Sequence, residues 1–170
     1  WMRRAATLAL ILILGLSENA FAEGFALYEY SARNVALGGA AVARKPDPSA
    51  VATNPALITR LPGASVQAGF NLITPESTIS TVTPSGEKES SSMRPATWVT
   101  PNLYYTQRAN DDWYFGIGGF SRFGLGFEYP HDWPGRYNIY QLDLKTFSVN
   151  PNIAWAATDN LSLAAGVELM

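Results

Sequence analysis

The sequence predicts an all-β fold, and it favours a transmembrane antiparallel β-barrel over a soluble β-sandwich. From residue 65 onward, large apolar residues alternate with polar or small ones, as in strands that have one apolar face. Short and long connections between these strands follow one another along the chain. The N-terminus has the layout of a secretory signal, so the chain is expected to leave the cytoplasm.

The first 22 residues are expected to be a cleaved signal peptide. Arg3 and Arg4 precede an apolar run over residues 5–16, and Ala20-Phe21-Ala22 places small residues before Glu23. A membrane-spanning helix needs about 20 apolar residues, so this run is too short to be one. No other stretch is long enough for a helical span, and membrane insertion would therefore have to use strands.

Residues 51–63, "VATNPALITRLPG", predict a short helix ahead of the strands. Asn54 is expected to cap this helix, with Pro55 in its first turn and Pro62-Gly63 at its end. We therefore divide the mature chain into a helical segment over residues 23–63 and a strand region over residues 64–170.

Five segments carry the strand pattern: residues 65–73, 99–107, 113–120, 147–156 and 161–169. In the third, Phe115 and Ile117 alternate with Gly116 and Gly118. Aromatic residues near strand ends are expected to form girdles at the membrane interface: Trp98, Trp113, Tyr114 and Trp155.

The connections favour a barrel, although a secreted sandwich also has alternating strands and stays an alternative. Residues 108–112 and 158–160 predict short turns, and residues 83–96 and 124–142 predict long loops. Outer-membrane barrels have short periplasmic turns and longer extracellular loops. Five strands are too few to close such a barrel, and lipid does not tolerate open sheet edges. We therefore expect this sequence to be the N-terminal part of a larger protein.

Composition argues against several other functions. The 12 Lys and Arg residues nearly balance 14 Asp and Glu residues, which gives no reason to expect nucleic-acid binding. His131 is the one histidine and the chain lacks cysteine, so no zinc site of His and Cys ligands is expected. No G-x-S-x-G nucleophile motif is present. We expect no catalytic residues, no metal and no cofactor, and we interpret His131 as a surface-loop residue.

Four stretches together resemble the FadL/TodX family of outer-membrane transporters for long-chain fatty acids and aromatic hydrocarbons. They are "EGFALYEYSARNVALGGAAVA" from residue 23, "NPALITRLPG" from residue 54, "FGLGFEYPHDWPGRY" from residue 123 and "LKTFSVNPNIAWAATDNLSLAAGVEL" from residue 144. The resemblance implies a 14-stranded barrel, of which about the first five strands are present. It also implies that residues 23–63 form a hatch of short helices inside the barrel.

The resemblance implies roles for particular residues. Gly24, Phe25 and Leu27 would lie near the ligand, and Asn54-Pro55-Ala56 matches the signature tripeptide of the hatch. The family's kinked third strand, which opens the barrel wall sideways, matches residues 118–126. The kink residues are then Ser121, Arg122, Phe123, Gly124 and Gly126.

The implied function is passive uptake of hydrophobic small molecules across the bacterial outer membrane by a monomeric barrel surrounded by outer-membrane lipid. Two other functions stay open at this point. One is a small structural or adhesive outer-membrane barrel, and the other is a secreted soluble β-sandwich that binds ligands.

Overall fold

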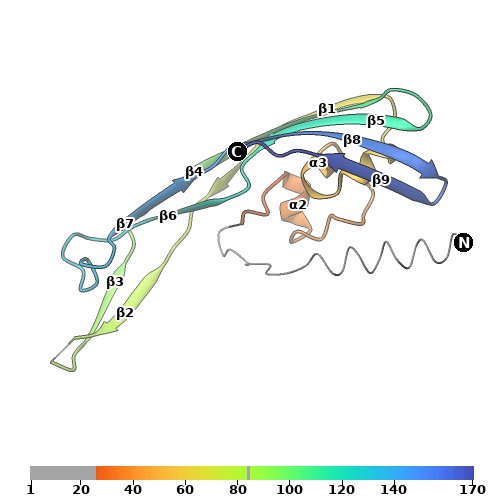
Figure 1. Ribbon diagram of the computed structural model, residues 1–170. Helices are drawn as coiled ribbons and strands as arrows, with labels where there is room; N and C mark the ends of the chain where they lie inside the picture. Colours follow the sequence, from red (N-terminus) through yellow and green to blue (C-terminus); the bar gives the residue numbers. More distant parts are fainter. Residues whose placement is uncertain (1–25, 84) are drawn as a thin grey trace, which may run out of the picture.

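The structure is a computed structural model that describes residues 26–83 and 85–170 (Figure 1). The expected signal peptide, Gly24 and Phe25 lie outside this part. The helices are α2 (Ala32–Ala36), α3 (Ala50–Thr53) and the 3-10 helix η1 (Pro55–Arg60). The strands are β1 (Ala64–Ile73), β2 (Thr78–Val82), β3 (Lys88–Ser92), β4 (Trp98–Arg108), β5 (Trp113–Phe120), β6 (Gly124–Glu128), β7 (Gln141–Lys145), β8 (Ser148–Thr158) and β9 (Leu161–Gly166).

Five long strands form one antiparallel sheet in the order β1-β4-β5-β8-β9. These are the five segments that the sequence pattern predicts, and each pairs with its neighbour in the meander. The turn between β4 and β5 and the turn between β8 and β9 are short, as expected. The all-β expectation is therefore confirmed for the part of the chain that the structure describes.

The two long connections are not plain loops, and that expectation is wrong. Strands β2 and β3 form a hairpin that continues β1 and β4, and strands β6 and β7 form one that continues β5 and β8 (Figure 1). The β2–β3 hairpin has no apolar face, because paired hydroxyls join its strands: Thr78 with Ser92 at 2.9 Å and Ser80 with Ser90 at 2.8 Å. Such a strand gives no period-two apolar signal in the sequence.

The two hairpin extensions are held together by a small aromatic cluster. Met93 packs with Tyr129 and Trp133, and the rings of the last two stack with centroids 5.0 Å apart. An ion pair between Arg94 and Glu128, with N and O 2.9 Å apart, joins the same two hairpins.

The last strand is shorter than predicted because of Pro151. Strand β9 ends at Gly166, and the same register resumes only at the isolated bridge between Val149 and Leu169. Pro151 lies opposite the interruption, and a proline has no N–H to donate to a ladder. The side chain of Glu168, within the interruption, therefore lies outside the regular strand.

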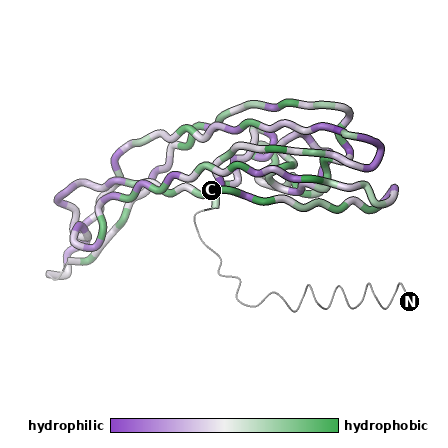
Figure 2. The backbone as a smooth tube through the Cα atoms, turned by 45° about the horizontal axis from the view of Figure 1, so that its top comes forward, coloured by the Kyte–Doolittle hydropathy of each residue, from purple (hydrophilic) through white to green (hydrophobic). Residues whose placement is uncertain are grey.

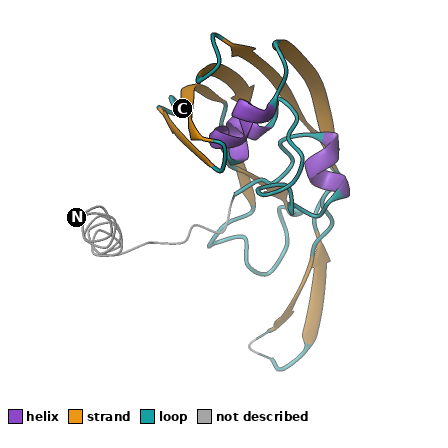
Figure 3. Cartoon of the chain, turned by 90° about the vertical axis from the view of Figure 1, so that its right-hand side faces the viewer, coloured by secondary structure: helices purple, strands orange, loops and turns teal. Residues whose placement is uncertain are grey.

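The sheet curves around the helices, which lie on its concave face (Figure 3). The large apolar side chains of the strands point to the convex face and are exposed; Val66 is 69% and Phe70 is 65% exposed. The concave face carries small, polar or tyrosine side chains together with Phe120, and it is buried. Its buried members include Asn102, Tyr104, Thr106, Ser148, Asn152 and Ala154.

This arrangement is the reverse of a soluble sandwich, whose apolar strand faces pack into the core. Here the apolar faces of β1, β4, β5, β8 and β9 all point outward. Figure 2 shows apolar residues recurring along the strands. The sandwich alternative is therefore wrong for the described part of the chain. An outward apolar face and an inward polar face are typical of membrane barrels.

The helices approach the sheet closely because β5 has glycines on the concave face. A β-carbon at Gly116 would lie 2.8 Å from Val51 Cγ2, and one at Gly118 would lie 2.9 Å from Val51 Cγ1. Val51 of α3 and Ile58 of η1 are buried in the same cluster as Tyr104 and Phe120. The glycines therefore make room for the helical segment.

The expected aromatic girdle is only partly present. Trp113 and Trp155 stack on the convex face with ring centroids 5.9 Å apart, and both are partly exposed. Tyr114 instead points to the concave face and is buried in the core, because it is one residue out of phase with Trp113. Assigning Tyr114 to a girdle is therefore wrong.

Among residues 26–83 and 85–170, no helix combines the length and the apolar character needed to cross a bilayer.

We predict that Gly118→Ala destabilises the packing of α3 on the sheet by about 1–3 kcal/mol, the usual cost of overfilling a packed core. The added methyl would lie 2.8 Å from the Tyr104 ring as well as against Val51. Urea unfolding of the full-length protein in detergent measures this change. Gly69→Ala is the matched control, since its methyl meets only the Asn102 side chain at 3.2 Å. Equal stability of the two variants would contradict the close packing.

Candidate functional site

The sheet opens between β4 and β6. Strand β4 extends to Trp98, but its pairing with β5 stops at Leu103 and Gly119. Strand β5 ends at Phe120, and the next residues leave the sheet before β6 begins at Gly124 and pairs with β7. Within the described residues, the first part of β4 thus has a partner on its β1 side and none on its β5 side.

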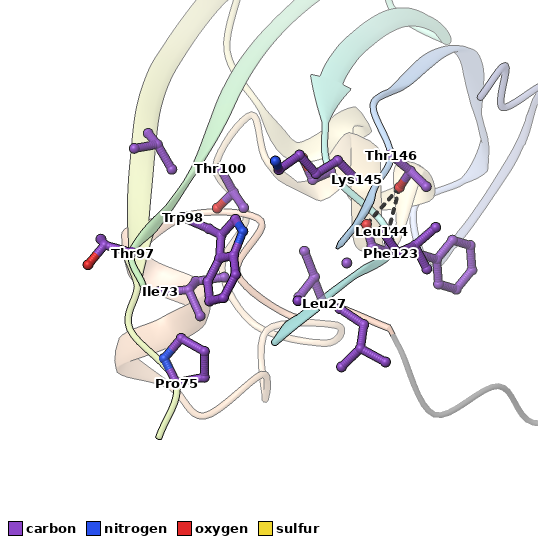
Figure 4. Close-up of a pocket in the computed structure, with 15 residues that line it drawn as sticks. Leu27, Ile73, Pro75, Thr97, Trp98, Thr100, Phe123, Leu144, Lys145 and Thr146 are labelled. Carbon is purple, nitrogen blue, oxygen red and sulfur yellow. Dashed lines mark hydrogen bonds between the residues drawn. The ribbon is translucent and has the colours of Figure 1, made fainter. Parts of the chain in front are cut away.

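A cavity of about 410 Å³ occupies this opening (Figure 4). That volume lies in the range of small-molecule binding sites. One wall comes from the end of β1 and the start of β4, and the other comes from β6 and β7. Its lining is mainly apolar or hydroxyl-bearing: Leu27, Ile73, Pro75, Thr97, Trp98, Val99, Thr100, Ser121, Phe123, Gly124, Leu125, Gly126, Leu144, Lys145 and Thr146.

Ala26 and Leu27, which we call the N-terminal segment, lie along one side of the cavity. Ala26 forms an isolated antiparallel bridge with Phe123, and the Leu27 N–H donates to the carbonyl of Arg122 at 2.8 Å. The Leu27 side chain fits over Gly124, where a β-carbon would lie 3.1 Å from Leu27 Cδ1. The pairing of β4 with β5 stops before the kink, and the N-terminal segment instead pairs with the kink backbone at Arg122 and Phe123.

Gly126 makes room for an aromatic side chain in the same way. A β-carbon at Gly126 would collide with the Trp98 indole. Trp98 lies in the cavity wall and contacts the aromatic cluster of the hairpin extensions. Its assignment to an interfacial girdle is therefore wrong.

Arg122 joins the kink to the helical segment and to the end of the chain. Its guanidinium forms an ion pair with Glu168, with N and O 2.6 Å apart, and the two side chains are only 25% and 22% exposed. Nη1 donates to the Tyr30 hydroxyl at 3.1 Å, and Nη2 donates to the Ala52 carbonyl at 3.4 Å. The guanidinium also lies over the Phe120 ring, 5.1 Å from its centroid. Arg122 therefore connects three parts of the chain.

Tyr30 and Tyr104 complete this connection. Tyr104, fully buried on β4, donates its hydroxyl to the Tyr30 carbonyl at 2.8 Å. Burial raises the pKa of the Tyr30 hydroxyl, against the opposing effect of Arg122, so the group is neutral at physiological pH. A neutral hydroxyl can accept the Arg122 hydrogen bond without adding a buried charge.

Asn54 does not cap a helix with its side chain, contrary to expectation. The predicted helix is present as η1, which begins at Pro55 and has Asn54 at its N-cap position. A separate short helix, α3, ends just before it at Thr53, so Asn54 lies at the junction of the two. The Asn54 amide Nδ2 donates to the Val42 carbonyl at 2.9 Å and so ties the junction to the preceding loop. The backbone of Asn54, with φ −149° and ψ 87°, lies outside the α region that a following proline disfavours.

Pro55 and Ala56 begin η1, which lies against β5, β8 and β9 on the concave face. The carbonyl of Ala56 accepts a hydrogen bond from the Thr59 hydroxyl at 2.8 Å. Thr59 in turn lies 2.9 Å from the Ser162 hydroxyl of β9.

The structure brings together some of the predicted site residues and separates others. Leu27, Ser121, Phe123, Gly124 and Gly126 line the cavity, and Arg122 lies directly behind it. Asn54, Pro55 and Ala56 are outside its lining.

Three parts of the cavity wall were not predicted: Ile73, residues 97–100 and residues 144–146. The last group lies beside a predicted long loop, where the alternation of "QLDLK" was the available signal.

His131 lies in the loop between β6 and β7. Its ring lies near that of Tyr140, with centroids 5.0 Å apart. In residues 26–83 and 85–170, no three His, Asp or Glu side chains are grouped as metal ligands would be.

The sequence is similar to known transport proteins over most of its length. Residues 13–170 match the family described as outer membrane protein transport protein (OMPP1/FadL/TodX). A long-chain fatty acid transport protein of Escherichia coli K12 is 30% identical over 155 residues, which are 89% of this chain and 34% of the relative. A protein of the same name from Salmonella typhi is 29% identical over 157 residues, or 90% of this chain and 35% of the relative.

The fold also matches a solved structure. A crystal structure of a Pseudomonas aeruginosa FadL homologue superposes with a TM-score of 0.63 at 18% identity, covering 75% of this chain and 33% of that one. This likeness confirms the predicted fold class. The chain spans about a third of the length of the relatives it matches.

We predict that Arg122 and Glu168 are energetically coupled. Arg122→Gln, Glu168→Gln and the double variant should give a coupling energy of about 0.5–3 kcal/mol, because either single change leaves a partly buried charge without its partner. Urea unfolding of the full-length protein provides the values. Arg94 and Glu128, whose pair is more exposed, are the matched control and should couple by no more than roughly 1 kcal/mol. Coupling that is no larger at Arg122 would contradict its role as a connector.

Proposed function

Since the chain belongs to the OMPP1/FadL/TodX family of outer membrane transport proteins, we propose that it is part of a barrel that takes up hydrophobic compounds. The substrates proposed are long-chain fatty acids or aromatic hydrocarbons, and transport is passive. The observation that carries this proposal is the mainly apolar cavity at the break between β4 and β6, covered by the N-terminal segment.

In this proposal the barrel is a monomer in the outer membrane, and its exposed convex face contacts lipid. Residues 23–63 act as the hatch. Their fit on the concave face through Val51 and Ile58, and the hydrogen bonds of Arg122 and Tyr104, support this role.

Substrate leaves sideways through the opening between β4 and β6. The kink residues Ser121 and Phe123, together with Gly124 and Gly126, line that route. Transfer of a methylene group from water into an apolar phase is favourable by about 0.8 kcal/mol, so a long acyl chain has a strong preference for entering the bilayer directly. Exit into the aqueous periplasm would give up that free energy.

Movement of the hatch precedes exit. Among the described residues, the contacts that must break at the kink are the bridge between Ala26 and Phe123, the Leu27 hydrogen bond and the contact of Leu27 with Gly124. Gly24 and Phe25, directly before them in the sequence, are proposed to contact the ligand. Asn54, Pro55 and Ala56 are proposed to set the shape of the hatch at the junction of α3 and η1.

We predict that a disulfide between Ala26→Cys and Phe123→Cys stops uptake. The chain has no cysteine, and residues bridged in an antiparallel pair have Cα atoms about 4.5–5.5 Å apart, a separation that a disulfide accepts. Uptake of radiolabelled oleate and toluene by cells that express the full-length protein should be lost after oxidation. Reduction should restore it, because the cross-link holds the N-terminal segment over the cavity.

Thr78→Cys with Ser92→Cys is the matched control, since this directly paired position lies in the β2–β3 hairpin away from the cavity. Its oxidation should leave uptake unchanged. If the cross-link at Ala26 and Phe123 forms completely and uptake of both compounds continues, the proposed release of the N-terminal segment is wrong.

A further inference from the structure

Among the described residues, the wall of the cavity carries one kind of charge. Lys145 is the basic residue of this lining, which contains no described aspartate or glutamate. The other lining residues are apolar or carry hydroxyls. A neutral hydrocarbon would gain nothing from an ammonium group at this place, whereas an anion would.

The strand register shows that Lys145 faces the cavity. In the β6–β7 pair, Lys145 lies opposite Gly124 and Asp143 lies opposite Gly126. Directly paired residues of an antiparallel ladder share a face. This is the face on which β-carbons at the two glycines would meet Leu27 and Trp98. Figure 4 shows the Lys145 side chain extending across the opening toward Thr100.

The present partner of Lys145 is weakly held. Its Nζ lies 2.7 Å from Asp143 Oδ2, but the two side chains are 66% and 47% exposed. Ion pairs with this much solvent contact contribute little free energy. Asp143 lies on the same face of β7 but outside the cavity lining, so an anion in the cavity would compete with Asp143 for the ammonium and displace a weak pair.

The hydroxyls of the wall are less available than the ammonium. The Thr146 hydroxyl donates to the Phe123 carbonyl at 2.8 Å and accepts from the Phe123 N–H at 3.0 Å. The Thr97 hydroxyl lies 3.1 Å from that of Thr74. Lys145 is the charged group of the described lining, and an ammonium discriminates between an anionic and a neutral headgroup more strongly than a hydroxyl does.

We propose that Lys145 binds the anionic headgroup of a carboxylate amphiphile whose apolar chain lies against Leu27 and Trp98. This inference rests on the proposed transport of hydrophobic compounds and names the ligand class of the same cavity. Lys145 makes the opening selective for chains that carry a carboxylate over neutral chains of equal length. Its ammonium forms a charge-assisted hydrogen bond with the carboxylate, while the chain gains free energy from burial.

The test compares palmitate with hexadecanol, which has the same chain length and a neutral headgroup. Binding to the full-length protein in a non-ionic detergent is measured by titration calorimetry. We expect Lys145→Met to weaken palmitate binding about five- to tenfold and to leave hexadecanol binding within about twofold, as for the loss of one partly exposed charge-assisted hydrogen bond. Lys145→Arg should preserve palmitate binding, and Asp143→Asn should strengthen it.

Lys88→Met is the matched control, because Lys88 lies in β3 outside the cavity lining. It should change neither affinity. Equal loss of both ligands in Lys145→Met, or no loss of either, overturns the role of Lys145 while the proposed transport stands. Failure of the wild-type protein to bind either ligand overturns both this inference and the proposed function.

Discussion

The rest of the structure depends on which face of the sheet is apolar. Because the large apolar side chains of the five strands point outward, the concave face must be filled by something other than a conventional apolar core. The chain fills it with its own preceding segment. Glycines on β5 allow this fit because they leave room for Val51 of α3. Polar side chains of the sheet also contact the helix, and Asn152 of β8 donates to the Val51 carbonyl. A sheet of opposite polarity would have no place for this helical segment.

The same polarity explains why the site lies at the kink. Lipid does not tolerate unsatisfied backbone groups, so a gap in a barrel wall is stable only where another segment satisfies or shields them. Here the N-terminal segment does so through Ala26 and Leu27, and Arg122 ties the kink to Tyr30 and Glu168. Among the described residues, the backbone contacts of Ala26 and Leu27 hold this segment at the opening, and these contacts would have to break to uncover it. The glycines at residues 124 and 126 serve this local geometry by admitting Leu27 and Trp98.

The sequence was sufficient to predict the five long strands and their apolar faces. The kink residues came from the family resemblance, and four of them, Ser121, Phe123, Gly124 and Gly126, are among the residues that line the cavity. Period-two patterns and short turns are local signals, so they survive without knowledge of the fold. The hairpins β2–β3 and β6–β7 were not predicted, because one is hydroxyl-rich on both faces and the other adjoins a stretch rich in proline and glycine. The partners of Arg122 and Asn54 depend on contacts between distant segments, and no local pattern encodes them. Tyr114 and Trp98 show the limit for aromatic residues, since position near a strand end does not say which face a ring occupies.

Leu163 and Ser162, neighbours on β9, report whether the apolar face of the sheet contacts lipid. In the full-length protein in outer membranes, spin labels at Leu163→Cys and Ser162→Cys would report access to oxygen, which concentrates in lipid, and to a water-soluble nickel chelate. If the apolar face lies in lipid, oxygen access is high at Leu163, whose side chain points to the convex face. Oxygen access is low at Ser162, whose hydroxyl meets Thr59 on the concave face. Equal oxygen access at the two positions, or greater access at Ser162, would contradict an outward apolar face in lipid.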